Sequence, residues 1–343
     1  MSDRISSRIP QLRFTFAVAV LGLISQFSNP AQATILYATS VTNSLIDRVD
    51  MSTNTVTTYL NTPSDADSIM FDSAGRLIYT ELYTTNVDRY DPSTLTNTVI
   101  ASGLNNPADI VMEPGGNSML VSEFYGAKID RIDLNTNLLT TLPVPGIAVG
   151  GPEGLAYDGS RLFANLGVRS GGPTGKYLAE INPVTGAIIA QSPGLNSLDG
   201  LTYDPYSGML FASSLLGNLV YEIDPNNLSN VSILGGSRPV TILGPDGITT
   251  DGLGNIFVAS SSSDGDSHIY QFNLPSNTLT QGPMVVGLDD LAPASGPGSA
   301  VPEPACLSLV AMGAFLLRRR RHGGCDRTHH GPRAQSPAAG KEI

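Results

Sequence analysis

The chain is poor in the residues that carry most nucleophilic and metal chemistry. Its two cysteines, Cys306 and Cys325, lie near the C-terminal end, and His268 is the one histidine between residues 34 and 300. This stretch therefore lacks a disulfide framework, a Cys/His zinc site and the several histidines from which a Ser-His-Asp triad could be drawn. Its stability must come from apolar burial and strand hydrogen bonds.

Positive charge is also scarce. Residues 34 to 300 hold 26 Asp and Glu against 9 Lys and Arg, a net charge of -17, whereas the whole chain carries -11. Because an acidic surface repels phosphate, we expect no nucleic-acid partner. Divalent cations and basic molecules are the natural partners of such a body.

A repeated pattern fills this acidic body. With 36 glycines, 24 prolines and only 14% charged residues, the composition suits many short strands joined by turns. One aliphatic position recurs with steps of 41, 45, 46, 47 and 43 residues, at Ile69, Ile110, Leu155, Leu201, Ile248 and Leu291. A period in the forties that is built only of strand patterns is typical of β-propeller blades.

Each repeat contains four strand patterns, so one repeat makes one blade. Residues 35 to 60 supply three further strands, and the segment from Asp289 to Ala292 supplies the missing first strand. The sequence therefore predicts an all-β fold, a six-bladed β-propeller over residues 34–292, closed by a composite blade of N- and C-terminal strands and followed by a linker at 293–300. Closure of this kind protects the edges that an open row of blades would leave.

Three elements of the fifth whole repeat carry a family resemblance. Pro245-Asp246-Gly247-Ile248, Gly254-Asn255-Ile256-Phe257-Val258-Ala259 and Ile269-Tyr270-Gln271-Phe272 resemble the six-bladed propellers of the NHL-repeat and senescence-marker/gluconolactonase type. The resemblance spans about residues 35 to 292. It implies the fold, and it does not imply one activity, because this fold hosts many functions.

Acidic residues stand at five of the six positions where a first strand enters the channel, and Ala108 stands at the other. We expect the channel mouth to hold Asp67, Glu153, Asp199, Asp246 and Asp289, with Asp109 and Asp290 beside them and Glu81, Glu123 and Asn165 from neighbouring strands. Clustered carboxylates repel unless protons or a cation compensate, and oxygen-only ligands favour Ca²⁺ or Mg²⁺. The resemblance to gluconolactonase-like enzymes implies Glu153, Asp199 and Asp246 as metal ligands. Hydrogen bonding to the entering turns, or a place in a water-filled channel, explains the same residues.

Three third-strand patterns repeat an Asp-Arg pair. These are Asp47-Arg48, Asp88-Arg89 and Asp130-Arg131. Their recurrence predicts inter-strand or inter-blade ion pairs, each of which contributes little at a surface.

The N-terminal 33 residues have the three parts of a secretory signal peptide. Arg4, Arg8 and Arg13 precede an apolar run at 14–24, and Ala31-Gln32-Ala33 supplies a small-x-small cleavage site. We therefore expect the Sec machinery to export the chain and cleavage to follow Ala33.

The C-terminal end resembles a PEP-CTERM sorting signal at residues 301–321. Pro302-Glu303-Pro304 precedes an apolar run at 305–317 and the basic cluster Arg318-Arg319-Arg320-Arg321. The resemblance implies export across the inner membrane of a Gram-negative bacterium, transient membrane insertion of a short helix, exosortase processing, and release at the cell surface or outside the cell. The apolar run is shorter than the ~20 residues of a full span. A polar tail at 322–343, which we expect to be disordered, extends beyond the arginines.

Two functions are compatible with these features. The first is an exported binding or scaffold propeller whose partner is an exopolysaccharide or a surface protein. The second is a divalent-metal-dependent, lactonase-like hydrolase with its site at the channel mouth. The shortage of catalytic residue types favours the first.

Overall fold

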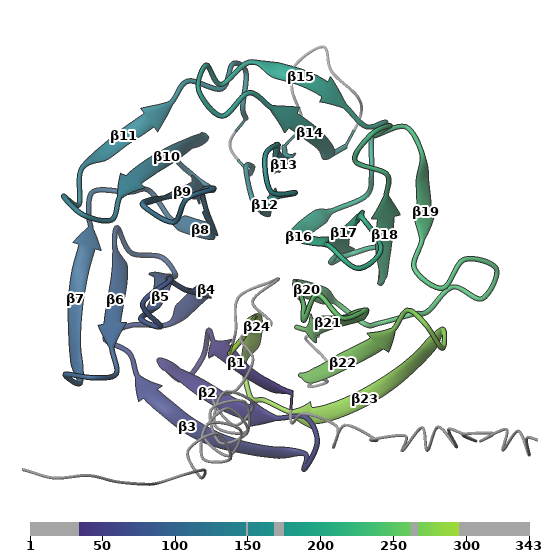
Figure 1. Cartoon of the computed structure of the whole chain (residues 1–343), viewed down its shortest axis with the longest axis horizontal. Coiled ribbons are helices and arrows are strands. Elements are labelled where there is room, and N and C mark those ends of the chain that lie inside the picture. The colour runs from purple at the N-terminus through teal and green to yellow at the C-terminus, as the bar shows by residue number, and fades with distance from the viewer. Residues whose placement is uncertain (1–33, 149, 168–174, 262–266, 295–343) are drawn as a thin grey trace, which may run out of the picture.

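A computed structural model describes residues 34–148, 150–167, 175–261 and 267–294, and these residues form six four-stranded antiparallel sheets arranged as the blades of a ring (Figure 1). The all-β, six-bladed prediction is confirmed. The predicted signal peptide, the sorting signal and the polar tail lie outside the described residues. Within those residues, no helix is long and apolar enough to cross a membrane.

The blades are numbered from the composite one, and each is given from its inner strand to its outer strand. Blade 1 is β24 (Leu288–Pro293), β1 (Ile35–Ser40), β2 (Leu45–Asp50) and β3 (Thr55–Asn61). Blade 2 is β4 (Ala66–Phe71), β5 (Leu77–Glu81), β6 (Val87–Asp91) and β7 (Thr96–Ala101). Blade 3 is β8 (Pro107–Met112), β9 (Ser118–Glu123), β10 (Lys128–Asp133) and β11 (Leu139–Leu142).

The remaining three blades follow the same order. Blade 4 is β12 (Leu155–Tyr157), β13 (Leu162–Leu166), β14 (Tyr177–Ile181) and β15 (Ile188–Gln191). Blade 5 is β16 (Leu198–Asp204), β17 (Met209–Ser214), β18 (Leu219–Ile223) and β19 (Val231–Ile233). Blade 6 is β20 (Pro245–Thr250), β21 (Asn255–Ser260), β22 (His268–Asn273) and β23 (Thr278–Met284).

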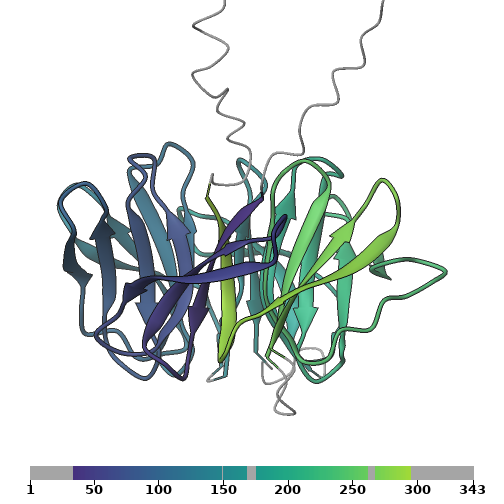
Figure 2. The ribbon, with the colours of Figure 1, turned by 90° about the horizontal axis from the view of Figure 1, so that it is seen from below.

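Blade 1 closes the ring as predicted. Its inner strand β24 pairs antiparallel with β1, with Ala38 opposite Leu291 and Leu36 opposite Pro293. Figure 2 shows β24 and β1 side by side in this blade, although their residues are about 250 positions apart in the sequence. Pairing of the two ends covers the inner edge of β1 with β24, so the N-terminal strands of blade 1 do not present that edge unpaired.

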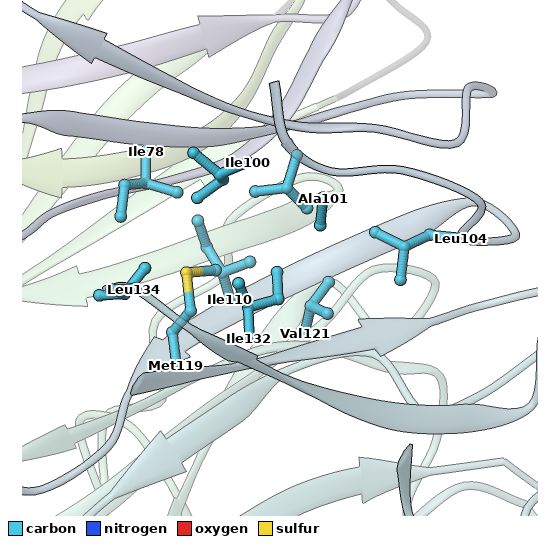
Figure 3. Close-up of a cluster of buried hydrophobic side chains, with 10 residues drawn as sticks. Ile78, Ile100, Ala101, Leu104, Ile110, Met119, Val121, Ile132 and Leu134 are labelled. Carbon is cyan, nitrogen blue, oxygen red and sulfur yellow. The ribbon is translucent and has the colours of Figure 1, made fainter. Parts of the chain in front are cut away.

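Apolar side chains fill the space between neighbouring blades. Between blades 2 and 3, Ile78 and Ile100 face Ile110, Met119 and Ile132, and all of them are buried (Figure 3). Successive side chains of a strand point to opposite faces of the sheet. Runs of apolar residues such as β5 therefore place apolar side chains on both faces of a blade, and the neighbouring blades cover both. Repeated around the ring, this packing is the core of the protein.

The inner strands of blades 2, 3, 5 and 6 share a β-bulge at the same place. Their register shifts between Ala66 and Ile69, between Pro107 and Ile110, and at the equivalent positions of blades 5 and 6. A bulge leaves backbone groups out of the ladder and re-aims the side chains on it. In blades 2 and 3 a hydroxyl compensates: the Ser68 amide donates to Thr80 Oγ1 at 2.9 Å, and the Asp109 amide donates to Ser122 Oγ at 2.9 Å.

Blade 4 approaches blade 5 closely through Gly154, beside its predicted ligand Glu153. A Cβ atom at Gly154 would lie 2.5 Å from the Asp199 carbonyl oxygen and 2.6 Å from the Leu201 nitrogen. We expect Gly154→Ala to lower the free energy of unfolding by about 1–3 kcal/mol, because the inner strands must separate. Urea unfolding measures this loss, and an unchanged midpoint would contradict the close approach.

Candidate functional site

Each blade places one residue, on or just before its inner strand, in the lining of the channel mouth. A cavity of about 390 Å³ opens there, and the carboxyl groups of Asp67, Glu153, Asp199, Asp246 and Asp289 line it. These five come from blades 2, 4, 5, 6 and 1, which follow one another around the ring except for the gap at blade 3. The carboxyl groups therefore form an arc with one opening, where blade 3 carries Ala108.

Aromatic side chains line the cavity on the side of that opening. Tyr83 follows β5, and Phe124 and Tyr125 follow β9, so all three lie in the turns between second and third strands of blades 2 and 3. Tyr83 is 76% exposed and Tyr125 is 48% exposed. Exposed aromatic residues beside a cavity often mark a binding surface. The mouth thus has an acidic side and an aromatic side.

The acidic arc holds its protons more tightly than free carboxyl groups do. Burial, followed by the charges of neighbouring carboxylates, raises the pKa values of Asp246 and Asp289 well above their ordinary range. Burial likewise raises the pKa of Asp67, which shares a hydrogen bond with Asp289, and that of Asp199 to about 6 with a hydrogen bond to Asp246. A hydrogen bond between two carboxyl groups needs one proton, so the arc contains two proton-sharing pairs.

Lys176 provides a cation at one end of the arc. Its ammonium group pairs with Glu153 and donates to the Leu198 carbonyl at 2.8 Å. The same nitrogen lies 6.0 Å from the ring centre of Phe124, so it bridges the acidic and aromatic sides. Burial and the Asp199 charge nevertheless raise the pKa of Glu153 to about 8. Among the residues that the structure describes, no ion pair is formed by Asp246, Asp289 or Asp67.

Removal of this cation has a pH-dependent cost. We expect Lys176→Met to lower the free energy of unfolding by roughly 1.5–3 kcal/mol at pH 9, where Glu153 is ionised, and by less at pH 6, where it is protonated. Lys176→Arg keeps the charge and should retain most of the stability at both pH values. Thermal unfolding of the two variants measures the difference, and an equal loss at pH 6 and pH 9 would contradict this role.

Three of the predicted mouth residues lie elsewhere. Glu81, Glu123 and Asn165 are buried within their blades and are not among the described residues that line the cavity. They lie on β5, β9 and β13, the second strands from the channel axis in their blades. Asn165 donates to the Asp199 carbonyl at 2.6 Å and so supports the bulge of blade 5.

Asp109 lines the cavity, but its carboxylate is used to join three blades. It accepts hydrogen bonds from the Leu155 amide at 2.6 Å and from Ser68 Oγ at 2.7 Å. Asp290 repeats the device between blades 1 and 2, where it accepts from Ser68 Oγ at 2.9 Å and from the Ile69 amide at 3.2 Å. The hydrogen-bonding alternative of the sequence analysis therefore describes these two residues.

The residues suggested as metal ligands do come together. Glu153, Asp199 and Asp246 all line the cavity. However, among the residues that the structure describes, no three Asp, Glu, His or Cys side chains are placed to hold a metal ion. Glu153 pairs with Lys176, and Asp199 with Asp246, so these groups satisfy one another in the arrangement seen.

The predicted Asp-Arg ion pairs are only partly present. Arg131 pairs with Glu113 at 2.7 Å and donates to the Pro183 carbonyl of the next blade. Its neighbour Asp130 lies on the other face of the strand, as period-2 alternation requires, and pairs with Lys128 at 2.7 Å.

Lys176 and the aromatic side of the mouth were not predicted from the sequence. The available signal was positional: Leu82-Tyr83, Phe124-Tyr125 and Leu215-Leu216 stand at equivalent turns of three blades. Leu216 is 77% exposed, so large apolar residues recur in turns that have no packing reason for them.

Comparison with known proteins supports the fold and goes no further. No protein-family model and no curated protein matches the sequence. A chain in the crystal structure of a nidogen/laminin complex is similar, with a TM-score of 0.63 and 16% identity over 77% of this chain and 98% of that one. The structure of a streptogramin B lyase is also similar, with a TM-score of 0.54 and 15% identity over 74% of this chain and 80% of that one.

Proposed function

We propose that this protein is an exported binding module whose channel mouth holds a polysaccharide that carries amino groups. The observation that supports the proposal most directly is the two-sided mouth, with a carboxyl arc facing exposed aromatic side chains across a cavity of about 390 Å³. This volume is within the ~300–1,000 Å³ range of ligand pockets.

The two sides suit the two chemical characters of an amino sugar. The apolar face of a sugar ring packs against an aromatic ring such as Tyr125, because both surfaces lose contact with water. Carboxyl groups with raised pKa values donate and accept hydrogen bonds with sugar hydroxyls, and those that ionise pair with an ammonium group. Lys176, which lies between Glu153 and Phe124, shows how an ammonium group fits between the two sides.

Calorimetry with two matched oligosaccharides tests the proposal. Chitosan hexamer carries amines, and its fully N-acetylated counterpart has the same backbone without charge. We expect the amine form to bind at least tenfold more tightly, with an affinity that falls as salt is added. Equal affinity for the two, or no binding of either, would overturn the proposal; equal binding of a lysine-rich peptide would replace the polysaccharide by a protein partner.

Two tyrosines provide a control pair for the surface. Tyr125, at the mouth, is 48% exposed, and Tyr206, in the turn between β16 and β17 at the other end of the channel, is 55% exposed. Tyr125→Ala should weaken chitosan binding about tenfold, and Tyr206→Ala should leave it unchanged. An equal loss in both variants would show that the mouth does not hold the sugar.

The hydrolase alternative is tested in the same instrument. Titration with Ca²⁺, Mg²⁺, Mn²⁺ and Zn²⁺ should give no heat of binding if the module is non-catalytic. Binding together with lactone hydrolysis that Asp199→Ala abolishes would favour the metal-dependent enzyme instead.

Export and sorting are proposed from the two ends of the sequence. The signal peptide at 1–33 and the Pro302-Glu303-Pro304 signal at 301–321 support Sec export, exosortase processing and a final place at the cell surface or in an exopolysaccharide matrix. Deletion of residues 301–343 should move the product into the free secreted fraction. An unchanged distribution would remove the exosortase part of the proposal and leave the binding part untouched.

A further inference from the structure

The central channel changes character along its length. Beyond the bulges, a second cavity of about 510 Å³ is lined by residues of all six inner strands, mainly apolar ones such as Phe71, Met112, Tyr157, Tyr203 and Leu291. Asp109, Gly200 and Asp290 line both cavities and mark the boundary between them. The protein thus presents an acidic mouth at one end of the channel and an apolar cavity at the other.

The polypeptide leaves the propeller at the apolar end. Ala292 and Pro293, the last residues of β24, line the apolar cavity, and the next residue, Ala294, donates a backbone hydrogen bond to the Ile35 carbonyl at 3.0 Å. The sequence continues to Ile343. Whatever follows residue 294 therefore starts beside the cavity.

The sequence after residue 294 contains an apolar segment that is close enough along the chain to reach the apolar cavity. Ten residues separate Ala294 from the apolar run at 305–317, which includes Leu307, Leu309 and Val310. At ~3.3–3.6 Å per residue these ten span up to about 35 Å, more than enough to return to the channel axis. The four arginines after the run also complement the acidic body, whose net charge between residues 34 and 300 is -17.

We propose that the apolar cavity binds the chain's own apolar run at 305–317. The cavity has room for a few aliphatic side chains and not for a whole helix, so one short stretch of the run enters it. Because the linker is short, the effective concentration of the run at the cavity is in the mM range, and weak intrinsic affinity suffices. A run from a second copy does not have this advantage. The contact keeps the run out of water until a membrane competes for it, and it is independent of what the acidic mouth binds.

The cysteines of the chain allow a direct test. Cys306 is the second residue of the run, and no described residue is a cysteine. In the full-length chain with Cys325→Ser, Met112→Cys places a thiol in the apolar cavity, whereas Tyr83→Cys places one at the acidic mouth. With oxidised glutathione, we expect an intrachain disulfide between residues 112 and 306 and none from residue 83. Disulfide-linked dimers would assign the cavity to a second copy and overturn the proposal, as would equal disulfide formation from both sites.

A second measurement does not depend on forming a disulfide. Alkylation of Cys306 by N-ethylmaleimide in the Cys325→Ser chain should be at least tenfold slower in buffer than in guanidinium chloride. Met112→Asp, which puts a charge in the cavity, should restore fast alkylation, whereas Leu95→Ala, a change at an exposed turn of blade 2, should not. Equal rates in all three chains would overturn the proposal.

Discussion

Asp289→Asn is expected to make the protein more stable at pH 8, by roughly 1–3 kcal/mol, while it weakens binding at the mouth. Burial and the charge of Asp67 raise the pKa of Asp289 well above its ordinary range. The native state therefore keeps a proton that the unfolded chain releases near pH 4, and stability falls as the pH rises from that value through the native pKa. An asparagine donates a hydrogen bond to Asp67 without a proton to lose, so the pH-dependent loss becomes smaller.

Urea unfolding at pH 5 and pH 8 measures this change. The matched control is Asp91→Asn, because hydrogen bonds from Ser93 lower the pKa of Asp91, and this carboxylate stabilises the turn in its ionised form. The control should therefore lose stability at pH 8. If Asp289→Asn is also less stable than the unmodified protein at pH 8, burial and repulsion between Asp289 and Asp67 do not destabilise the native state at that pH. A gain in stability with a loss of chitosan affinity would be the usual exchange at a binding site.

The second large expected effect on stability concerns two buried carboxyl pairs that occupy equivalent positions in blades 2 and 3. In blade 3, Lys128 bonds to both Glu123, at 2.9 Å, and Asp130, at 2.7 Å. In blade 2 the equivalent carboxyls are Glu81 and Asp88, and Asn86 stands where Lys128 does, with its amide 3.3 Å from Glu81. Blade 2 therefore holds the same two acids without the cation.

The absence of a cation beside this pair is consistent with the raised pKa of Asp88. Burial, followed by the charge of Glu81, raises it from 3.8 to about 7. Since each pH unit of difference between the native and unfolded pKa corresponds to ~1.4 kcal/mol, this pair costs up to about 4 kcal/mol at pH 8 and little below pH 4. In blade 3, burial opposes ionisation of Asp130, but bonds from Glu123 and Lys128 outweigh it and lower the pKa.

A lysine at position 86 should stabilise the carboxyl pair of blade 2, and an asparagine at position 128 should destabilise that of blade 3. We expect Asn86→Lys to raise the free energy of unfolding at pH 8 by about 1–3 kcal/mol, and Lys128→Asn to lower it by roughly 1.5–3 kcal/mol. The gain from Asn86→Lys should shrink toward pH 4, where Asp88 is protonated in the native chain, whereas the loss from Lys128→Asn should persist at that pH, because the native pKa of Asp130 lies below its ordinary value. Guanidinium unfolding across this pH range measures both variants, and a stabilising Lys128→Asn would show that the ammonium group is not what supports the pair.

The repeat could be predicted from the sequence because its signals are local. Aliphatic positions such as Ile69 and Leu291 recur at a nearly constant spacing, and period-2 alternation between turn residues specifies strands. The composite blade followed from the same pattern, since residues 35 to 60 lack a first strand and Asp289 to Ala292 lack the others. The identity of the carboxyl positions in the mouth was also visible, because repetition in sequence means repetition around the ring.

The burial and hydrogen-bond partners of these carboxyl groups depend on contacts between blades. Glu81 and Glu123 had the same signal as a mouth residue, but both are buried within their blades, where Glu123 accepts a hydrogen bond from the Asn105 amide and pairs with Lys128. Asp109 and Asp246 both stand on bulged inner strands. The Asp109 carboxylate accepts a hydrogen bond from the Leu155 amide of the next blade, whereas the Asp246 carboxyl group is hydrogen-bonded to Asp199. No local pattern distinguishes these outcomes.

The sequence by itself determined the all-β class, the number of blades, the closure of the ring and the excess of negative charge, because each depends on a repeated local pattern or on composition. Tertiary structure alone decided which carboxyls meet, that Lys176 from β14's N-terminal side reaches Glu153, and that the channel is acidic at one end and apolar at the other. The physical reason is that burial and charge interactions depend on distances of a few Å between residues that are 23 to 222 positions apart.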